Sequence, residues 1–168
     1  MTSTPRAHDH EICMAAAHAR AEKLFVARGL KLTPLRRRVF EEIARSHDAV
    51  GAYDVLDRLA RSSGERIAPI SVYRALDALL EAGVVHRLES RNAFFACHAP
   101  HAPAARHIAL LCETCGTVNE IDGGAVHAAI DDAVTGAGFT PRQAVVEIAG
   151  RCAPCGARSA GGEEAATG

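Results

Sequence analysis

The sequence contains no tryptophan, and its aromatic side chains are two tyrosines and five phenylalanines. It also has no apolar stretch of about 20 residues, the length that a membrane-spanning helix requires. The first thirty residues mix His, Asp, Arg and Lys with Ala and lack the apolar segment of a signal peptide. We therefore expect a cytoplasmic protein with no membrane partner, in a reducing compartment where thiols persist.

The common sequence marks of enzymes are missing as well. There is no glycine-rich phosphate loop, no nucleophile elbow, no paired-carboxylate arrangement and no solenoid repeat. We expect neither catalysis nor a small-molecule substrate. At 168 residues, about half of them apolar, the chain is long enough for one or two small domains with cores of their own.

Charge is nearly balanced, with a net charge of −1. Residues 1–90 carry 14 Lys or Arg against 12 Asp or Glu, whereas residues 91–168 carry 5 against 8, so the halves are +2 and −3. This asymmetry is weak evidence for a nucleic-acid partner, because DNA-binding domains are usually more basic. The tight basic run is Arg36–Arg38.

Two Cys-x-x-Cys pairs are the most informative motifs: Cys112 with Cys115, and Cys152 with Cys155. Each pair offers two thiolates from one tight turn, and the glycine after each pair suits a left-handed turn conformation. Four thiolates match a closed structural zinc site with Zn–S bonds of about 2.3 Å. The long separation, residues 116–151, makes such a zinc a clamp between distant strands. Two disulfides are the alternative, which a reducing compartment disfavours.

The N-terminal half predicts four helices and a β-hairpin. Apolar residues at helical spacing predict helices over about 11–28, from Pro34, over 52–61 and over 69–83. Thr33 before Pro34 is a favourable helix start, and in that second helix Arg37, Arg38, Glu41 and Glu42 are expected to face solvent. Two apolar runs, 84–89 and 93–97, flank the polar turn 90–92 and predict a hairpin. Helices followed by a hairpin indicate a winged helix-turn-helix domain, whose last helix lies in the DNA major groove. On this pattern alone, a small unrelated helical domain is the alternative.

The C-terminal half predicts a smaller domain. We expect strands over 108–111 and 117–121, a helix over 124–135 and a last strand over 143–148 that leads into the second cysteine pair. The fold class is therefore α+β, with an N-terminal winged helix-turn-helix DNA-binding domain and a small α/β zinc-containing domain. The expected ranges are a disordered arm 1–10, a DNA-binding domain 11–97, a His- and Pro-rich hinge 98–107, a metal-binding domain 108–157 and a disordered tail 158–168.

Several short motifs occur in an order shared with a known family. They are Leu32–Arg36, Ala52–Leu56, Ser71–Leu76, Glu81–Val85 and both cysteine pairs. Together they resemble the ferric uptake regulator family of bacterial metal-sensing repressors, over roughly residues 12–156. The resemblance implies a homodimer, joined through the C-terminal domain, that binds double-stranded operator DNA.

The zinc uptake regulator branch is the most similar. Its features here are Ala52–Asp54, Val72–Asp77, Val85–Ser90 and Ala96–His98. That branch uses a cysteine in its sensing site, and thiolate favours zinc, whereas imidazole and carboxylate admit several divalent metals. We expect a zinc-responsive repressor that controls zinc homeostasis genes. Iron, manganese or peroxide sensing within the family are alternatives, and a zinc enzyme with an open position at His86 and Cys97 is an alternative from another class.

The resemblance also implies a regulatory zinc site at His86, Cys97, His107 and Glu120, and thus two zinc ions per chain. Many relatives have a second histidine where this chain has Ala109, so His98 or His101 are alternatives to His107. Since the ligands come from both halves, binding is expected to lock the halves together.

For DNA, the resemblance implies base contacts by Tyr53 and Arg74, because arginine bound to guanine through two hydrogen bonds is the commonest specific contact. Arg36 and Arg37, with Arg38, are expected to contact phosphates, and Tyr73 to pack or contact the DNA backbone. Asp57 resembles a position that pairs adjacent dimers on one operator. The arginine expected three residues later is Ala60 here, although Arg61 follows it.

Overall fold

The protein is described from a computed structural model that covers residues 10–45, 47–64, 66–97 and 106–160. The chain folds into two compact units, Met1–Pro103 and Ala104–Gly168, and each is described by itself. The boundary falls inside the His- and Pro-rich segment 98–107. Within the described ranges, no helix is both long enough and apolar enough to cross a membrane.

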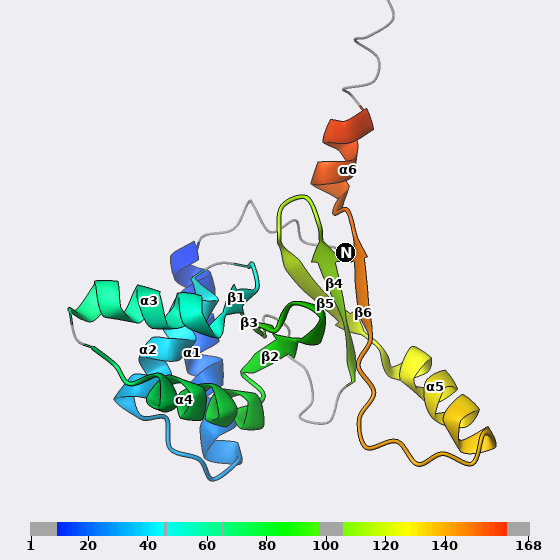
Figure 1. The fold of residues 1–168 in the computed structure, drawn as a ribbon, viewed down its shortest axis with the longest axis horizontal. Coiled ribbons are helices and arrows are strands. Elements are labelled where there is room, and N and C mark those ends of the chain that lie inside the picture. Colours follow the sequence, from blue (N-terminus) through cyan, green and yellow to red (C-terminus); the bar gives the residue numbers. More distant parts are fainter. Residues whose placement is uncertain (1–9, 46, 65, 98–105, 161–168) are drawn as a thin grey trace, which may run out of the picture. The chain divides into compact units, whose positions relative to one another are not determined.

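In its described residues, the first unit contains four α-helices, one 3-10 helix and a three-stranded sheet (Figure 1). The elements are α1 (His10–Ala27), α2 (Pro34–Ala44), β1 (Val50–Gly51), α3 (Ala52–Ser63), α4 (Pro69–Ala82), β2 (Val85–Leu88), the 3-10 helix η1 (Glu89–Arg91) and β3 (Ala93–Ala96). The four predicted helices and the hairpin are confirmed to within one or two residues. The short strand β1 was not predicted, and it pairs antiparallel with β3 to give the order β1-β3-β2.

Local chemistry explains most of these boundaries. The Thr33 hydroxyl oxygen accepts a hydrogen bond from the Arg36 amide at 3.4 Å, and Pro34 opens α2 at no cost in hydrogen bonds. Gly64 and Gly83 end α3 and α4 with φ of 66° and 74°, in the left-handed region that glycine adopts without strain. These signals lie within a few residues of each boundary, which is why the sequence predicts them.

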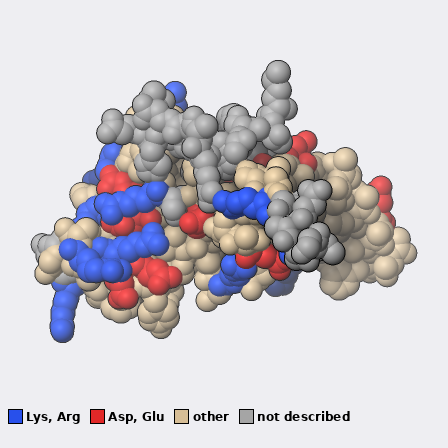
Figure 2. Space-filling view, turned by 90° about the horizontal axis from the view of Figure 1, so that it is seen from above, with Lys and Arg blue, Asp and Glu red and all other residues tan. Residues whose placement is uncertain are grey.

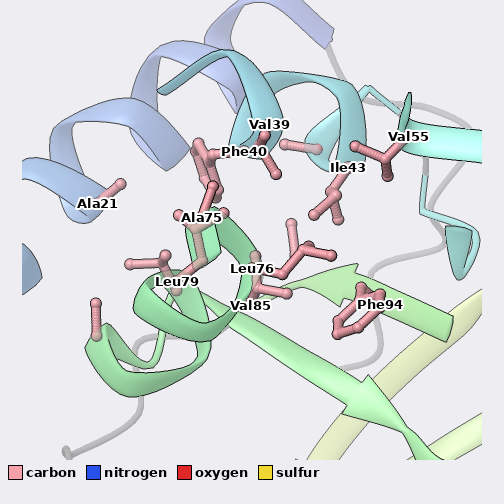
Figure 3. Close-up of a cluster of buried hydrophobic side chains, with 14 of the residues drawn as sticks. Ala21, Val39, Phe40, Ile43, Val55, Ala75, Leu76, Leu79, Val85 and Phe94 are labelled. Carbon is pink, nitrogen blue, oxygen red and sulfur yellow. The ribbon is translucent and has the colours of Figure 1, made fainter. Parts of the chain in front are cut away.

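The core of this unit lies where the helices cover the sheet (Figure 3). Side chains from α2, α4 and the hairpin point toward one another, including Phe40, Ile43, Leu76, Leu79 and Val85. Burying one side chain of this size stabilises a fold by about 1.5–3 kcal/mol. Because the inner face of α4 is held in this way, its outer face is presented as a rigid surface.

One prediction for α2 was wrong. Glu42 is 3% exposed and does not face solvent. The guanidinium of Arg45 lies 3.2 Å from its carboxylate, and Arg58 of α3 donates to its backbone carbonyl at 3.3 Å. Glu42 is buried because α3 packs against this side of α2, a tertiary contact that helical periodicity does not reveal.

Over residues 106–160, the second unit consists of a three-stranded sheet and two helices. Its elements are β4 (His107–Cys112), β5 (Val118–Asp122), α5 (Gly124–Gly136), β6 (Glu147–Gly150) and α6 (Ala153–Ala160). The strand order is β5-β4-β6, with β4 antiparallel to β5 and parallel to β6. The two helices leave opposite ends of the sheet (Figure 1). The predicted strands β4 and β5 and the helix α5 are confirmed.

Two predictions for this unit need correction. The last strand was expected over 143–148, but β6 covers 147–150, because its ladder with β4 runs from Ala109 opposite Glu147 to Cys112 opposite Gly150. The second cysteine pair lies at the start of α6, and residues 158–160, predicted to be disordered, complete that helix. Pro154 is compatible with α6 because it lies in the first turn, where a missing N–H leaves no helical bond unmade.

Candidate metal centre and nucleic-acid interface

The fold brings the four paired cysteines into one cluster. Cys112 ends β4, Cys115 lies in the following turn, Cys152 follows β6 and Cys155 lies in α6. Their four sulfur atoms all lie within 4.8 Å of one another, and Cys115 and Cys152 are 3.8 Å apart. A tetrahedron of Zn–S bonds has sulfur–sulfur edges of about 3.8 Å. The five cysteines from Cys97 onward are free thiols, so the structure does not adopt the disulfide alternative.

The two cysteine turns differ in conformation. Gly116 has a φ of 77° and donates its N–H to the Cys112 carbonyl at 2.8 Å, as the predicted left-handed turn requires. Gly156 donates to the Cys152 carbonyl at 2.9 Å from within α6. The prediction of a left-handed glycine was therefore right for Gly116 and wrong for Gly156. The second pair opens a helix, whose backbone geometry itself closes the turn.

Hydrogen bonds favour thiolate at two of the four sulfurs. The Cys152 N–H, 3.3 Å from Sγ of Cys112, together with the Cys115 amide lowers the pKa of Cys112 to about 6. The Thr117 hydroxyl, 3.3 Å from Sγ of Cys115, lowers the pKa of that thiol as well. Negative charge on sulfur, which metal coordination requires, is thus stabilised before any cation arrives.

The remaining sulfurs show why the cluster requires a cation. For Cys152, the hydrogen bond from the Cys155 amide lowers the pKa. Its effect is outweighed by burial and by the neighbouring thiols of Cys155, Cys112 and Cys115. The pKa of Cys152 is therefore raised to about 11. Four negative charges within 4.8 Å of one another repel strongly. Arg158 donates a hydrogen bond to Cys155, with 2.9 Å between Nη2 and Sγ, and this bond raises the pKa of Arg158. Its guanidinium is one positive charge beside the cluster. Four soft donors that need further positive charge fit Zn²⁺.

The residues expected to form the regulatory site lie as one pair in each unit. In the first unit, His86 of β2 packs against Phe95, with ring centroids 5.8 Å apart. Cys97 follows β3, is 6% exposed, and donates its N–H to the Val84 carbonyl at 3.0 Å. His86 is opposite Phe95 in the strand register, and Cys97 comes two residues after Phe95. Opposite residues share a face of an antiparallel pair, as do residues two apart, so His86 and Cys97 are diagonal neighbours on one face of the hairpin.

In the second unit, His107 of β4 lies beside Glu120 of β5. Their Nε2 and Oε1 atoms are 3.7 Å apart, and the Glu120 side chain is 5% exposed. Ala109 is directly opposite Glu120 in the strand register. The possible substitutes His98 and His101 fall outside the described residues.

The predicted DNA contacts divide into two groups. Tyr53, Tyr73 and Arg74 are exposed on α3 and α4, as base- or backbone-contacting side chains must be. Arg36 and Arg37 are engaged within the protein: Arg36 donates to the Lys31 carbonyl, and Arg37 pairs with Glu22 of α1 at 2.8 Å. Figure 2 shows Lys and Arg interspersed with Asp and Glu on the face in view, in agreement with the small net charge.

The position associated with pairing of adjacent dimers also has a local role. The Nε of Arg61 donates to the backbone carbonyl of Asp57 at 3.3 Å, within α3. This contact spans one turn of the helix.

Three residues of the second unit were missed by sequence reasoning. Thr117 and Arg158 contact the cysteine cluster, and each had a signal in its spacing, two residues after Cys115 and three after Cys155 on a helix. His127 is buried in α5, and its signal in the sequence was weaker: it is a polar residue among apolar neighbours.

Comparison with known proteins gives concordant results. The sequence model of the Ferric uptake regulator family matches residues 27–149. The chain is 38% identical over 137 residues to the zinc uptake regulation protein of Escherichia coli (strain K12). The aligned segment covers 82% of this chain and 80% of that protein. It superposes on a zinc uptake regulator complexed with zinc and DNA with a TM-score of 0.79 and 35% identity, covering 88% of this chain and 97% of that one. The crystal structure of holo XcZur gives a TM-score of 0.74 and 36% identity, covering 89% and 99%.

Proposed function

Because this chain belongs to the ferric uptake regulator family, we propose that it is a zinc-responsive transcriptional repressor of the zinc uptake regulator type. It binds double-stranded operator DNA as a zinc-loaded homodimer and controls zinc homeostasis genes. The observation that carries this choice is Cys97, a buried thiol outside the cysteine cluster and on the same hairpin face as His86. A thiolate ligand favours zinc over the harder metals that imidazole and carboxylate admit.

Cys112, Cys115, Cys152 and Cys155 hold the structural zinc. When bound, Zn²⁺ joins the end of β4 to the start of α6 and supplies the positive charge that four thiolates need. Structural zinc sites contribute about 10–16 kcal/mol of binding free energy, which appears as folding free energy. The apolar core around Ile108, Leu111 and Val118 is small, so this contribution decides whether residues 108–157 fold.

His86, Cys97, His107 and Glu120 hold the regulatory zinc. Two of these residues belong to the first unit and two to the second. Zinc binding therefore favours the arrangement of the two units in which all four residues bind the same ion. A shift from 1% to 99% of that arrangement requires about 5.5 kcal/mol of differential binding. The short His107–Glu120 distance supports this assignment for the second unit.

Arg74 and Tyr53 read the operator, and Tyr73 contacts it from the same outer face of α4 as Arg74. Arg36 and Arg37 contact phosphates after exchanging their present partners, Lys31 and Glu22. The DNA-binding domain spans 11–97 and the dimerisation domain 108–157. With operator DNA as its partner, the protein acts in the cytoplasm.

The homodimer interface lies on the second unit. Several large apolar side chains are exposed there: Ile121 43%, Val126 44%, Phe139 66%, Val145 49% and Ile148 50%. Exposed apolar patches of this kind mark association surfaces. A second copy of the chain is the partner that the family relationship supplies.

Mobility-shift titrations on operator fragments test the proposal. Protein that keeps its structural zinc should bind only when a second equivalent of zinc is added, and Cys97→Ser should remove that response while leaving one zinc bound. Operator binding that is independent of zinc, or that responds to iron or manganese in place of zinc, would contradict it.

A further inference from the structure

His127 is a buried polar side chain that neither proposed zinc site uses. It lies in the first turn of α5 and is 3% exposed. Burying an imidazole costs free energy unless its polar atoms find hydrogen-bond partners. Its Nε2 lies 3.4 Å from the backbone carbonyl oxygen of His107. The first turn of the dimer-domain helix is therefore in contact with the main chain of a proposed sensing residue.

The strand register shows which edge of β4 this carbonyl faces. The Ala109 N–H donates to the Val146 carbonyl at 3.1 Å and so faces the β6 edge of β4. His107 is two residues earlier, so its backbone groups face the same edge. The ladder with β6 begins only at Ala109 opposite Glu147. That ladder begins two residues after His107, and the His127 imidazole reaches the His107 carbonyl at this end of β4.

Two further contacts hold the same segment against α5. The Gly123 N–H donates to the Arg106 carbonyl at 2.9 Å, and the Arg106 guanidinium pairs with Asp131. A Cβ on Gly123 would lie 2.9 Å from Cγ1 of Ile108 and 3.0 Å from Cδ2 of His127. A side chain at position 123 does not fit at these distances, so glycine allows the start of β4 to pack closely against the start of α5.

We propose that His127 is a positioning residue for the regulatory zinc site: it fixes the His107 main chain and thereby orients the imidazole that binds the metal. This inference rests on the proposed role of His107. Without the donor, the end of β4 has more freedom, and zinc must order it on binding. The expected loss is three- to tenfold in affinity, the size of one hydrogen bond of about 1 kcal/mol.

The test uses full-length protein loaded with its structural zinc. His127→Gln keeps an N–H donor at a similar distance, whereas His127→Leu keeps the volume and removes the donor. Zinc affinity of the second site is measured by competition with a chromophoric chelator. We expect a three- to tenfold loss for His127→Leu and less than a twofold change for His127→Gln. Amide exchange at residues 107–109 should increase in His127→Leu alone.

The His107→Ala background separates positioning from packing. If His127 acts through His107, His127→Leu should change zinc affinity little once His107 is already absent, because neighbouring mutations that share one mechanism are not additive. Equal losses in both backgrounds would overturn the proposal. So would a loss in His127→Gln as large as in His127→Leu, which would make His127 a metal ligand. If His127→Leu does not fold, His127→Asn, whose donor is too short to reach the carbonyl, takes its place.

The outcome also distinguishes this inference from the proposed function. Wild-type protein that binds a single zinc per chain, with no second site to titrate, would refute the regulatory site itself. A normal second site that is insensitive to His127→Leu would refute only the positioning role.

Discussion

His107 and Glu120 are diagonal neighbours on adjacent antiparallel strands, with 3.7 Å between Nε2 and Oε1. Each strand also leads to the cysteine cluster: β4 runs from His107 to Cys112, and β5 begins three residues after Cys115. The cysteine cluster therefore joins the two strands that carry half of the proposed sensor.

Replacing a cysteine of the cluster should be far more damaging than replacing Cys97. Cys112→Ser removes a ligand from the proposed structural zinc site, and sites of this class contribute about 10–16 kcal/mol to folding. We therefore expect loss of the zinc, of the second unit's fold and of the proposed dimer. Cys97→Ser should keep the fold and lose only regulation. Thermal melts and zinc content measure both. Equal unfolding of the two variants would refute the division into a structural and a regulatory site.

Glu120→Gln should weaken the second zinc by at least tenfold, because it replaces a charged oxygen ligand with a neutral amide at an unchanged position. Chelator competition gives the affinity, and DNA binding should require correspondingly more zinc. Glu113→Gln is the matched control, since Glu113 is an exposed carboxylate in the nearby cysteine turn. Equal effects of the two changes would show that net charge, not coordination, is responsible.

Arg74→Ala should weaken operator binding by about 1–3 kcal/mol, the value of one bidentate contact to guanine, and should reduce the preference for operator over unrelated DNA. Arg74→Lys should not restore it, because an ammonium group lacks the planar fork of guanidinium. Arg142→Ala, an exposed arginine of the second unit, controls for the lost charge. Titrations by fluorescence anisotropy at fixed salt give the affinities, and an unchanged preference in Arg74→Ala would exclude base reading by this side chain.

Zinc affinity of the cysteine cluster should rise with pH. In the metal-free cluster the pKa of Cys152 is raised to about 11, so its thiol holds a proton at neutral pH and must release it to bind zinc. The pKa of Cys112 is lowered to about 6, so a further proton must leave below that pH and the dependence becomes steeper. Calorimetry in buffers of different ionisation enthalpy counts the protons. Binding without proton release at pH 7 would contradict this account.

Phe139→Glu or Ile148→Glu should convert the homodimer to monomer, because each places a charge in the exposed apolar surface of the second unit. Val26→Glu is the matched control: Val26 is 79% exposed, but it lies on α1 in the first unit. Sedimentation velocity reports the oligomeric state. A dimer that survives both substitutions would place the interface elsewhere.

The sequence by itself determined the features whose causes lie within a few residues. Thr33 and Pro34 predict the start of α2, Gly83 predicts the end of α4, and the paired cysteines predict a four-thiolate cluster. The metal-sensing family could also be identified, because its motifs are contiguous runs of residues.

Only the tertiary structure decided the features that arise where distant segments meet. Glu42 is buried because α3 packs against α2, and Arg37 is paired because Glu22 of α1 lies beside it. The register of β6 depends on its pairing with β4, in which Glu147 lies opposite Ala109. These two residues are 38 positions apart in the chain. The contact of His127 with the His107 carbonyl joins α5 to β4, across 20 residues of the chain. Periodicity predicts which face of an element is apolar, but packing determines what that face meets.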